Sequence, residues 1–151
     1  MVLSDEQRAF LAEPHFAVAA TIGADGTPHQ TVIWYGIDGD ELVFSVPSGS
    51  AKHRHLQRDP RISVCVEDGF RYITLSGPAE LDERPEAARA QYALVGARYR
   101  GAARPMPAPP ARPDPGVAEL LSRPRVTVRV RIAKVLSQGF AAAAPGDTTP
   151  R

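Results

Sequence analysis

One short segment concentrates the side chains best suited to binding an anion. It runs Ser48-Gly49-Ser50-Ala51-Lys52-His53-Arg54-His55. Ser50 is a residue type that caps helix starts, and the free N–H groups at a helix N-terminus attract negative charge. Lys52 and His55 are three residues apart, so both lie on one face of the expected helix. The segment predicts a phosphate or carboxylate pocket, although a capped surface helix with solvated charges fits the same spacing.

Other kinds of catalytic or metal site find little support in the sequence. His29, His53 and His55 belong to two elements and lack the i, i+4 pair with a carboxylate that zinc hydrolases use, so no metal site is expected. Cys65, the single cysteine, is expected to be a small buried side chain. Neither a G-x-S-x-G elbow nor a G-x-G-x-x-G or P-loop motif occurs. No catalytic residue is assigned, and His29 is a candidate proton donor on chemical grounds alone, with no support from its position.

Apolar alternation and turn signals place these side chains on a mainly β framework of the α+β kind. The turns at 23–26 and 38–39 join the first three strands into an antiparallel meander. Gly77-Pro78 interrupts a long strand, as at a bulge or a sheet edge. Strands are expected at 16–22, 29–35, 42–46, 61–66, 71–81 and 126–136. Helices are expected at 4–13, 51–58 and 85–99, with one or two helical turns at 117–121. The pattern predicts a six-stranded antiparallel barrel with flanking short helices.

Length and composition fit a single domain. The chain has 151 residues and a mass of 16.3 kDa, and 43% of its residues are hydrophobic. We assign residues 1–140 to the domain and expect a disordered tail at 141–151. Six of the 15 prolines fall in 102–115, which predicts a mobile lid or an extended wrap. No apolar run reaches about 18 residues and no signal-peptide pattern is present, so we expect no membrane span and a cytoplasmic location.

The charge balance favours small acidic ligands over nucleic acid. The net charge is +1 and no basic stripe is present, so no nucleic-acid partner is expected. All 18 basic residues except Lys52 and Lys134 are arginine, whose planar fork matches carboxylate and phosphate. A GC-rich genome would produce the same excess of arginine and alanine.

The order of these features resembles a known family. FAVAATIGADGTPHQTVIWYGIDGDELVFSV is followed by SGSAKHRHLQRDPRISVCVED and then GFRYITLSGPAEL. This order resembles the pyridoxamine 5′-phosphate oxidase-like split β-barrel superfamily, and within it the actinobacterial reductases that use the deazaflavin coenzyme F420. The resemblance spans residues 4–137. Its most specific parts are the A-K-x-R-x-L-x-R-D-P-R run at 51–61 and the A-D-G-x-P turn at 24–28.

The resemblance implies a homodimer with two sites at the subunit interface, each built from both chains. In similar proteins the start of the helix at 51–58 holds the phosphate, the second strand lines the deazaflavin ring, and the partner chain adds the strand around Tyr72. His55 stands where the family commonly has asparagine. The cofactor-binding residues implied in this way are Thr31, Val32, Ile33, Ser45, Ser50, Ala51, Lys52, His55, Tyr72 and Arg125.

The same resemblance favours F420 over flavin mononucleotide (FMN). FMN oxidases of the superfamily tend to carry an arginine on the second strand for the phosphate, whereas residues 30–34 here are Gln-Thr-Val-Ile-Trp. Arg98, Arg100 and Arg104 are candidates for binding the acidic tail of F420, and solvated arginines at a helix end would look the same.

We therefore expect hydride transfer from reduced F420 to a conjugated or planar acceptor, such as a tetrapyrrole or a quinone-like compound. The alternatives are an FMN-dependent oxidoreductase of the same fold and a non-catalytic carrier of a flavin, F420 or haem. A barrel this small is filled by its own side chains. The site should then lie outside the barrel, where a second copy can close it.

Overall fold

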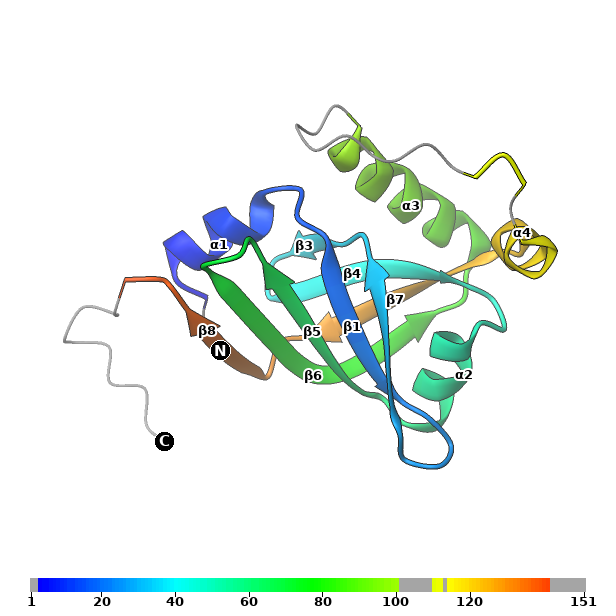
Figure 1. Cartoon of the computed structure of the whole chain (residues 1–151), viewed down its shortest axis with the longest axis horizontal. Helices are drawn as coiled ribbons and strands as arrows, with labels where there is room; N and C mark the ends of the chain where they lie inside the picture. Colours follow the sequence, from blue (N-terminus) through cyan, green and yellow to red (C-terminus); the bar gives the residue numbers. More distant parts are fainter. Residues whose placement is uncertain (1–2, 101–109, 113, 142–151) are drawn as a thin grey trace.

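The computed structural model describes residues 3–100, 110–112 and 114–141, and Figure 1 shows their arrangement. The strands are β1 (Ala17–Ile22), β2 (Pro28–Ile33), β3 (Gly36–Asp38), β4 (Glu41–Pro47), β5 (Arg61–Glu67), β6 (Tyr72–Asp82), β7 (Arg125–Arg131) and β8 (Lys134–Gln138). The helices are α1 (Asp5–Ala12), α2 (Ala51–Arg58), α3 (Pro85–Tyr99) and α4 (Pro115–Ser122). Most of the proline-rich segment and nearly all of the expected tail lie outside the described residues.

The strands form one split barrel in which every pair is antiparallel. They follow the order β2-β1-β5-β6-β7-β4-β3, and β8 pairs with β6 off this path. β6 belongs to both halves, because its residues 72–78 pair with β5 and its residues 79–82 pair with β7. In the described part of the chain no pairing joins β2 to β4, so the barrel stays open there. The mainly β split barrel with short flanking helices is thus confirmed.

The strand count differs from the six that the sequence predicts. β3 is a separate three-residue strand, and the expected strand at 126–136 is divided into β7 and β8. The division follows from two backbone hydrogen bonds: the Ile132 N–H donates to the Asp40 carbonyl (3.2 Å), and the Ala133 N–H donates to the Ser76 carbonyl (3.0 Å). At this point the chain leaves β4 while β6 remains its partner, although the apolar alternation continues up to it.

Alternate side chains of the strands fill the barrel. On β5, Ile62, Val64 and Val66 are buried while the residues between them are partly exposed. Tyr35 and Phe44 are the largest fully buried aromatic side chains of the strand region. Burying an aliphatic or aromatic side chain of this size contributes about 1.5–3 kcal/mol, so this interior accounts for much of the stability.

Side-chain caps fix the starts of the first two helices. The Gln7 N–H donates to Ser4 Oγ (3.1 Å) and the Ser4 N–H donates to Gln7 Oε1 (3.0 Å), which completes the capping box of α1. Ser50 caps α2 by accepting from the His53 N–H (3.4 Å). The Ser50 cap is the one that the sequence analysis predicts.

Arg98 fastens α3 to the rest of the fold. Its guanidinium donates to the carbonyls of Tyr35 (3.2 Å), Leu11 (2.5 Å) and Glu13, and it lies 4.7 Å from the centroid of the Tyr35 ring. α3 also packs against β4 and β7. These contacts use the guanidinium of Arg98 inside the fold, so Arg98 does not serve the acidic tail that the sequence suggested for it.

Gly77 lies where two backbones approach most closely. A Cβ atom at this position would stand 1.8 Å from the carbonyl oxygen of Arg131 and 3.2 Å from the nitrogen of Ala133. Both neighbours are backbone atoms, so no side-chain rotation can relieve the clash. Glycine inside a strand typically marks such a close approach.

Gly77→Ala is expected to destabilise the fold by about 3 kcal/mol, because the β7–β8 turn must move away from β6. Urea unfolding followed by circular dichroism measures the loss. Gly36→Ala is the control, since its new Cβ would meet nothing closer than the Val95 side chain at 3.6 Å. Equal stability of the two variants would contradict the close approach.

Candidate functional site

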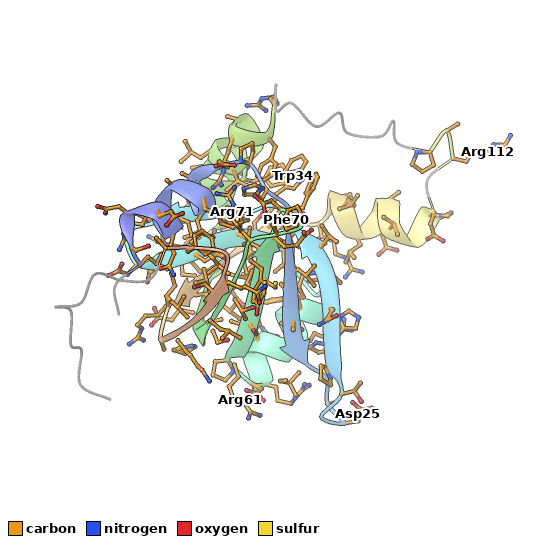
Figure 2. The ribbon with its side chains drawn as sticks, turned by 60° about the vertical axis from the view of Figure 1, so that its left-hand side comes forward. Asp25, Trp34, Arg61, Phe70, Arg71 and Arg112 are labelled. Atoms are coloured by element: carbon orange, nitrogen blue, oxygen red, sulfur yellow. The ribbon has the colours of Figure 1, made fainter. Side chains whose placement is uncertain are left out.

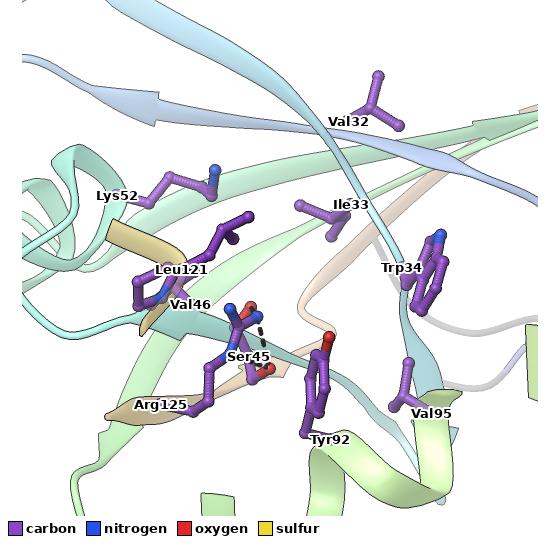
Figure 3. Close-up of a pocket in the computed structure, with 11 residues that line it drawn as sticks. Val32, Ile33, Trp34, Ser45, Val46, Lys52, Tyr92, Val95, Leu121 and Arg125 are labelled. Atoms are coloured by element: carbon purple, nitrogen blue, oxygen red, sulfur yellow. Dashed lines mark hydrogen bonds between the residues drawn. The ribbon is translucent and has the colours of Figure 1, made fainter. Parts of the chain in front are cut away.

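A pocket of about 330 Å³ lies in the opening between β2 and β4 (Figure 3). α3 forms one wall and α4 contributes to the rim. The volume is at the lower end of the range for small-molecule sites. The pocket is lined by Val32, Ile33, Trp34, Ser45, Val46, Pro47, Lys52, Tyr92, Val95, Leu121 and Arg125.

This pocket occupies the place where a strand pairing stops. β3 and β4 pair Gly36 with Val43 and Ile37 with Leu42. If this register continued, residues 32–34 would face residues 45–47, and these six residues are the ones that line the strand side of the pocket. Residues 28–33 pair with β1 along one edge, but among the described residues their other edge does not continue this ladder, and β2 diverges from β4. The divergence creates the space.

Two cations enter the pocket from different elements. The Lys52 ammonium donates to Thr31 Oγ1 (2.5 Å). Arg125 donates to Ser45 Oγ from Nε (3.2 Å) and from Nη2 (3.0 Å), and its guanidinium lies 4.7 Å from the centroid of the Tyr92 ring. Among the described residues, no carboxylate lies within 4.0 Å of either cation. The pocket therefore holds two positive charges without a neutralising partner.

The surroundings lower the pKa of both groups. Burial lowers the pKa of Lys52 below its ordinary value of 10.5, and the charge of Arg125 lowers it further. Burial also lowers the pKa of Arg125. A guanidinium starts from such a high pKa that it stays charged at neutral pH. An anion between the two groups would offset both their repulsion and their lost hydration.

The turn before α2 brings residues 52 and 125 together. Pro47, at the end of β4, is the register partner of Arg125 on β7. The next residue, Ser48, donates its N–H to the carbonyl of Pro124 (2.8 Å). The start of α2 is thus tied to the start of β7, and two cations far apart in sequence face one space.

The pocket rim adjoins an exposed apolar row on the outer face of the sheet. Register places Val32, Val18, Cys65, Thr74 and Leu136 side by side across β2, β1, β5, β6 and β8, and we call these residues the outer stripe. Val32 is 66% exposed, Leu136 56% and Val18 37%. Cys65 is only partly buried, against expectation, because it points to this face while its neighbours point into the core.

The comparisons with known proteins identify the family and support the fold. The sequence pattern of the family described as Pyridoxamine 5′-phosphate oxidase matches residues 3–138. The chain belongs to this family. Its split barrel is the fold that the family resemblance implied.

Named relatives of this oxidase-family chain include reductases. An F420H(2)-dependent biliverdin reductase of Mycobacterium tuberculosis is 29% identical over 136 residues, which are 89% of this chain and 87% of that protein. A solved structure described as an F420 reductase is 25% identical with a TM-score of 0.68, covering 89% of this chain and 98% of that one. The crystal structure of a conserved hypothetical protein of M. tuberculosis is 30% identical with a TM-score of 0.69, covering 99% and 96%.

The structure gathers part of the residue set that the sequence analysis named. Five of the ten line the pocket, and a sixth accepts from the Lys52 ammonium; these are Val32, Ile33, Ser45, Lys52, Arg125 and Thr31. Ser50 and Ala51 lie at the start of α2, beside the pocket. His55 faces Thr21 Oγ1 (2.9 Å) and the His29 ring, outside the pocket lining. Tyr72 lies on the outer face of β6, two residues from Thr74.

Two remaining arginines bear on the expected tail site. Arg100 is exposed just after the end of α3, which leaves its guanidinium accessible to a ligand. Arg104 lies outside the described residues. The tail site therefore stays a prediction for these two side chains.

Six pocket residues were absent from the set that the sequence analysis named: Trp34, Val46, Pro47, Tyr92, Val95 and Leu121. Tyr92 and Val95 are three residues apart on α3, and this helical spacing could have indicated a shared face. Trp34 stacks on Tyr99, with centroids 5.0 Å apart and planes at 8°. Figure 2 places Trp34 toward the end of the barrel that carries Phe70, away from Asp25 on the β1–β2 hairpin.

Two further properties concern only the described residues. They contain no group of three or more His, Cys, Asp or Glu side chains placed to bind a metal ion. None of their helices has the length and apolar character that a bilayer crossing requires.

Lys52 should titrate below 10.5, and Arg125→Met should move its pKa back up, because the substitution removes a nearby positive charge. Reductive ¹³C-methylation followed by NMR measures this directly, since Lys134 is the only other lysine. Arg129→Met is the control on the same strand, because Arg129 pairs with Asp38 (3.0 Å) and Glu41 (2.8 Å). An unshifted Lys52, or one indifferent to Arg125→Met, would show that the two cations do not share the pocket.

Proposed function

We propose that this protein is a coenzyme F420-dependent reductase that delivers hydride to a planar, conjugated acceptor. The observation that carries the proposal is the pair of unneutralised cations, Lys52 and Arg125, in a pocket bounded by the free edge of β2. The M. tuberculosis relative named as an F420H(2)-dependent biliverdin reductase supports it along most of the chain.

The residues present fit a deazaflavin with an anionic chain. Lys52, with Ser50 and Ala51 at the start of α2, would hold the phosphate, and Arg125 would hold an acidic group on the opposite side. Among the described residues β2 pairs with β1 alone, so alternate peptide groups along its other edge are free to bond the polar rim of a ring system. When bound in reduced form, the cofactor supplies the hydride.

The chain itself has to bind and orient the cofactor and the acceptor, and to exclude water from the space between them. Trp34, Tyr92, Val95 and Leu121 offer aromatic and aliphatic surface against which a flat acceptor can stack. The stack of Trp34 on Tyr99 keeps the indole in one orientation. Such walls hold an acceptor close to the donor and keep the space between them dry. Water at the open side of the pocket can protonate the product, so no side chain has to do so.

We also propose that the active form is a homodimer whose second copy covers the outer stripe. Val32 belongs both to the stripe and to the pocket lining, so a molecule packed on the stripe would also cover the pocket rim. Tyr72 shares the outer face, so in such a dimer it would be the residue of β6 that reaches toward the partner's pocket. An apolar row exposed to this extent favours association of two copies.

The cofactor is tested by titrating the protein with oxidised F420 and, separately, with FMN. Trp34 is the single tryptophan and lines the pocket, so quenching of its fluorescence reports occupancy. F420 should bind more tightly than FMN. Lys52→Ala should weaken F420 binding by about 1.5–3 kcal/mol, the contribution of a charge-assisted hydrogen bond, which is roughly 10- to 150-fold.

Lys134→Ala is the matched control, because it removes the other lysine, which is exposed on β8. FMN binding alone would overturn the F420 assignment in favour of an FMN-dependent oxidoreductase. F420 binding with no turnover of any planar acceptor would instead indicate a carrier. Unchanged affinity in Lys52→Ala would refute the assigned pocket.

Leu136→Asp should convert the dimer to a monomer, because it places a charge in the outer stripe without touching the pocket. We expect the dimer dissociation constant, measured by analytical ultracentrifugation, to rise by roughly ten-fold or more. Leu94→Asp is the control, since Leu94 is 70% exposed on α3 away from the stripe. A wild-type monomer, or a Leu136→Asp dimer of unchanged affinity, would refute this interface.

A further inference from the structure

His53 is a buried imidazole that lies behind the pocket and does not line it. Its side chain is about 7% exposed, and both ring nitrogens are used. Nδ1 accepts from the Gly49 N–H (2.9 Å), and an amide can only donate, so Nδ1 carries no proton. Nε2 then carries the proton and donates to Glu83 Oε1 (2.9 Å). The hydrogen bonds thus fix a neutral ring in a single tautomer.

Gly49, which donates to His53 Nδ1, lies in a turn fixed by several other hydrogen bonds. Gly49 has a φ of +74°, a conformation that glycine adopts without strain. Its carbonyl accepts from Arg54 Nη1 (2.5 Å). The residues on either side are also bonded, with the Ser48 N–H donating to Pro124 and Ser50 Oγ accepting from the His53 N–H. We call residues 48–50 the 48–50 turn.

The partners of His53 lie beside the elements that form the pocket. Gly49 is three residues before Lys52, and the 48–50 turn bonds to the residue before Arg125. Glu83 is two residues before Pro85, where α3 begins, and α3 carries Tyr92. The His53 imidazole therefore connects two parts of the site. One is the 48–50 turn, which positions both cations, and the other is the start of α3, the helix that forms the pocket wall.

We propose that His53 is a positioning residue for the anion site. Its neutral ring, with the proton on Nε2, holds the 48–50 turn so that Lys52 is directed at the anionic group of the bound cofactor. This inference rests on the proposed function for the identity of the ligand. It adds that a residue which touches neither ligand nor pocket sets the affinity.

Two substitutions test the hydrogen bonds of the two His53 ring nitrogens separately. His53→Asn keeps an acceptor near the position of Nδ1, whereas His53→Gln keeps a donor near the position of Nε2 and loses the bond to Gly49. F420 affinity, measured by fluorescence, should stay near wild type in His53→Asn and fall about three- to ten-fold in His53→Gln, the effect of one lost hydrogen bond. Gln57→Ala is the control, because Gln57 lies on the same helix and also bonds Glu83 (3.4 Å) without touching the turn.

A second readout does not depend on the cofactor. ¹⁵N NMR of the wild-type imidazole should show a protonated Nε2 and an unprotonated Nδ1. Hydrogen exchange of the Gly49 amide should be slow in wild type and His53→Asn and faster in His53→Gln. If His53→Gln does not fold, Glu83→Ala replaces it: loss of the exposed carboxylate frees Nε2, so the ring can change tautomer and Gly49 exchange should rise.

The outcomes distinguish this inference from the proposed function. If wild-type protein fails to bind F420, the proposed cofactor is wrong, and the same variants are compared with FMN as the probe. If wild type binds and Lys52→Ala weakens binding while His53→Gln and His53→Asn bind equally well, the positioning role is overturned and the function stands. Faster Gly49 exchange without any loss of affinity would likewise overturn it.

Discussion

The pocket exists because, in the described part of the chain, the β3–β4 ladder does not continue into β2, which pairs with β1 along its other edge. The peptide groups that such a ladder would have joined are left facing a gap, and unpaired backbone groups have to find water or another partner. Tyr99 stabilises the chain at residues 34–35, where β2 ends and diverges from β4. Its ring stacks on Trp34, its hydroxyl oxygen accepts from the Tyr35 N–H (3.2 Å), and its hydroxyl donates to the His15 carbonyl (2.6 Å). The Tyr99 side chain thus helps to keep the edge of β2 that faces the pocket apart from β4.

Electrostatics give this gap its preference for an anion. Most arginines on the strands and connections are matched with carboxylates, such as Arg129 with Glu41 and Arg131 with Glu80. Within the described part of the chain, Lys52 and Arg125 bond neutral oxygens and no carboxylate, and burial disfavours the charged form of each. Two like charges in a partly dry pocket are unfavourable until a ligand neutralises them. The free energy they cost the empty protein is therefore available to binding.

The same strands contribute side chains to the barrel core and to the exposed outer face. Inward residues of β1, β5 and β6 build the barrel, while outward residues of the same strands form the outer stripe, which ends at Val32 on the pocket rim. Alternation with a period of two makes this division possible without additional elements. Behind the pocket, the His53 ring ties α2 to the approach of α3, so the walls are not independent of one another.

The sequence by itself determined what depends on neighbours along the chain. The Ser4 and Ser50 caps, the bounds of α2 and the alternation of β5 follow from local propensity and period. It also named Lys52, Ser45 and Arg125, because the family resemblance carried those positions. Three-dimensional structure decided the rest. Three features depend on register between distant segments, about which a local pattern holds no information. They are the lack, among the described residues, of a pairing between β2 and β4, the division of β7 from β8, and the placement of Tyr92 in the pocket while His55 faces Thr21.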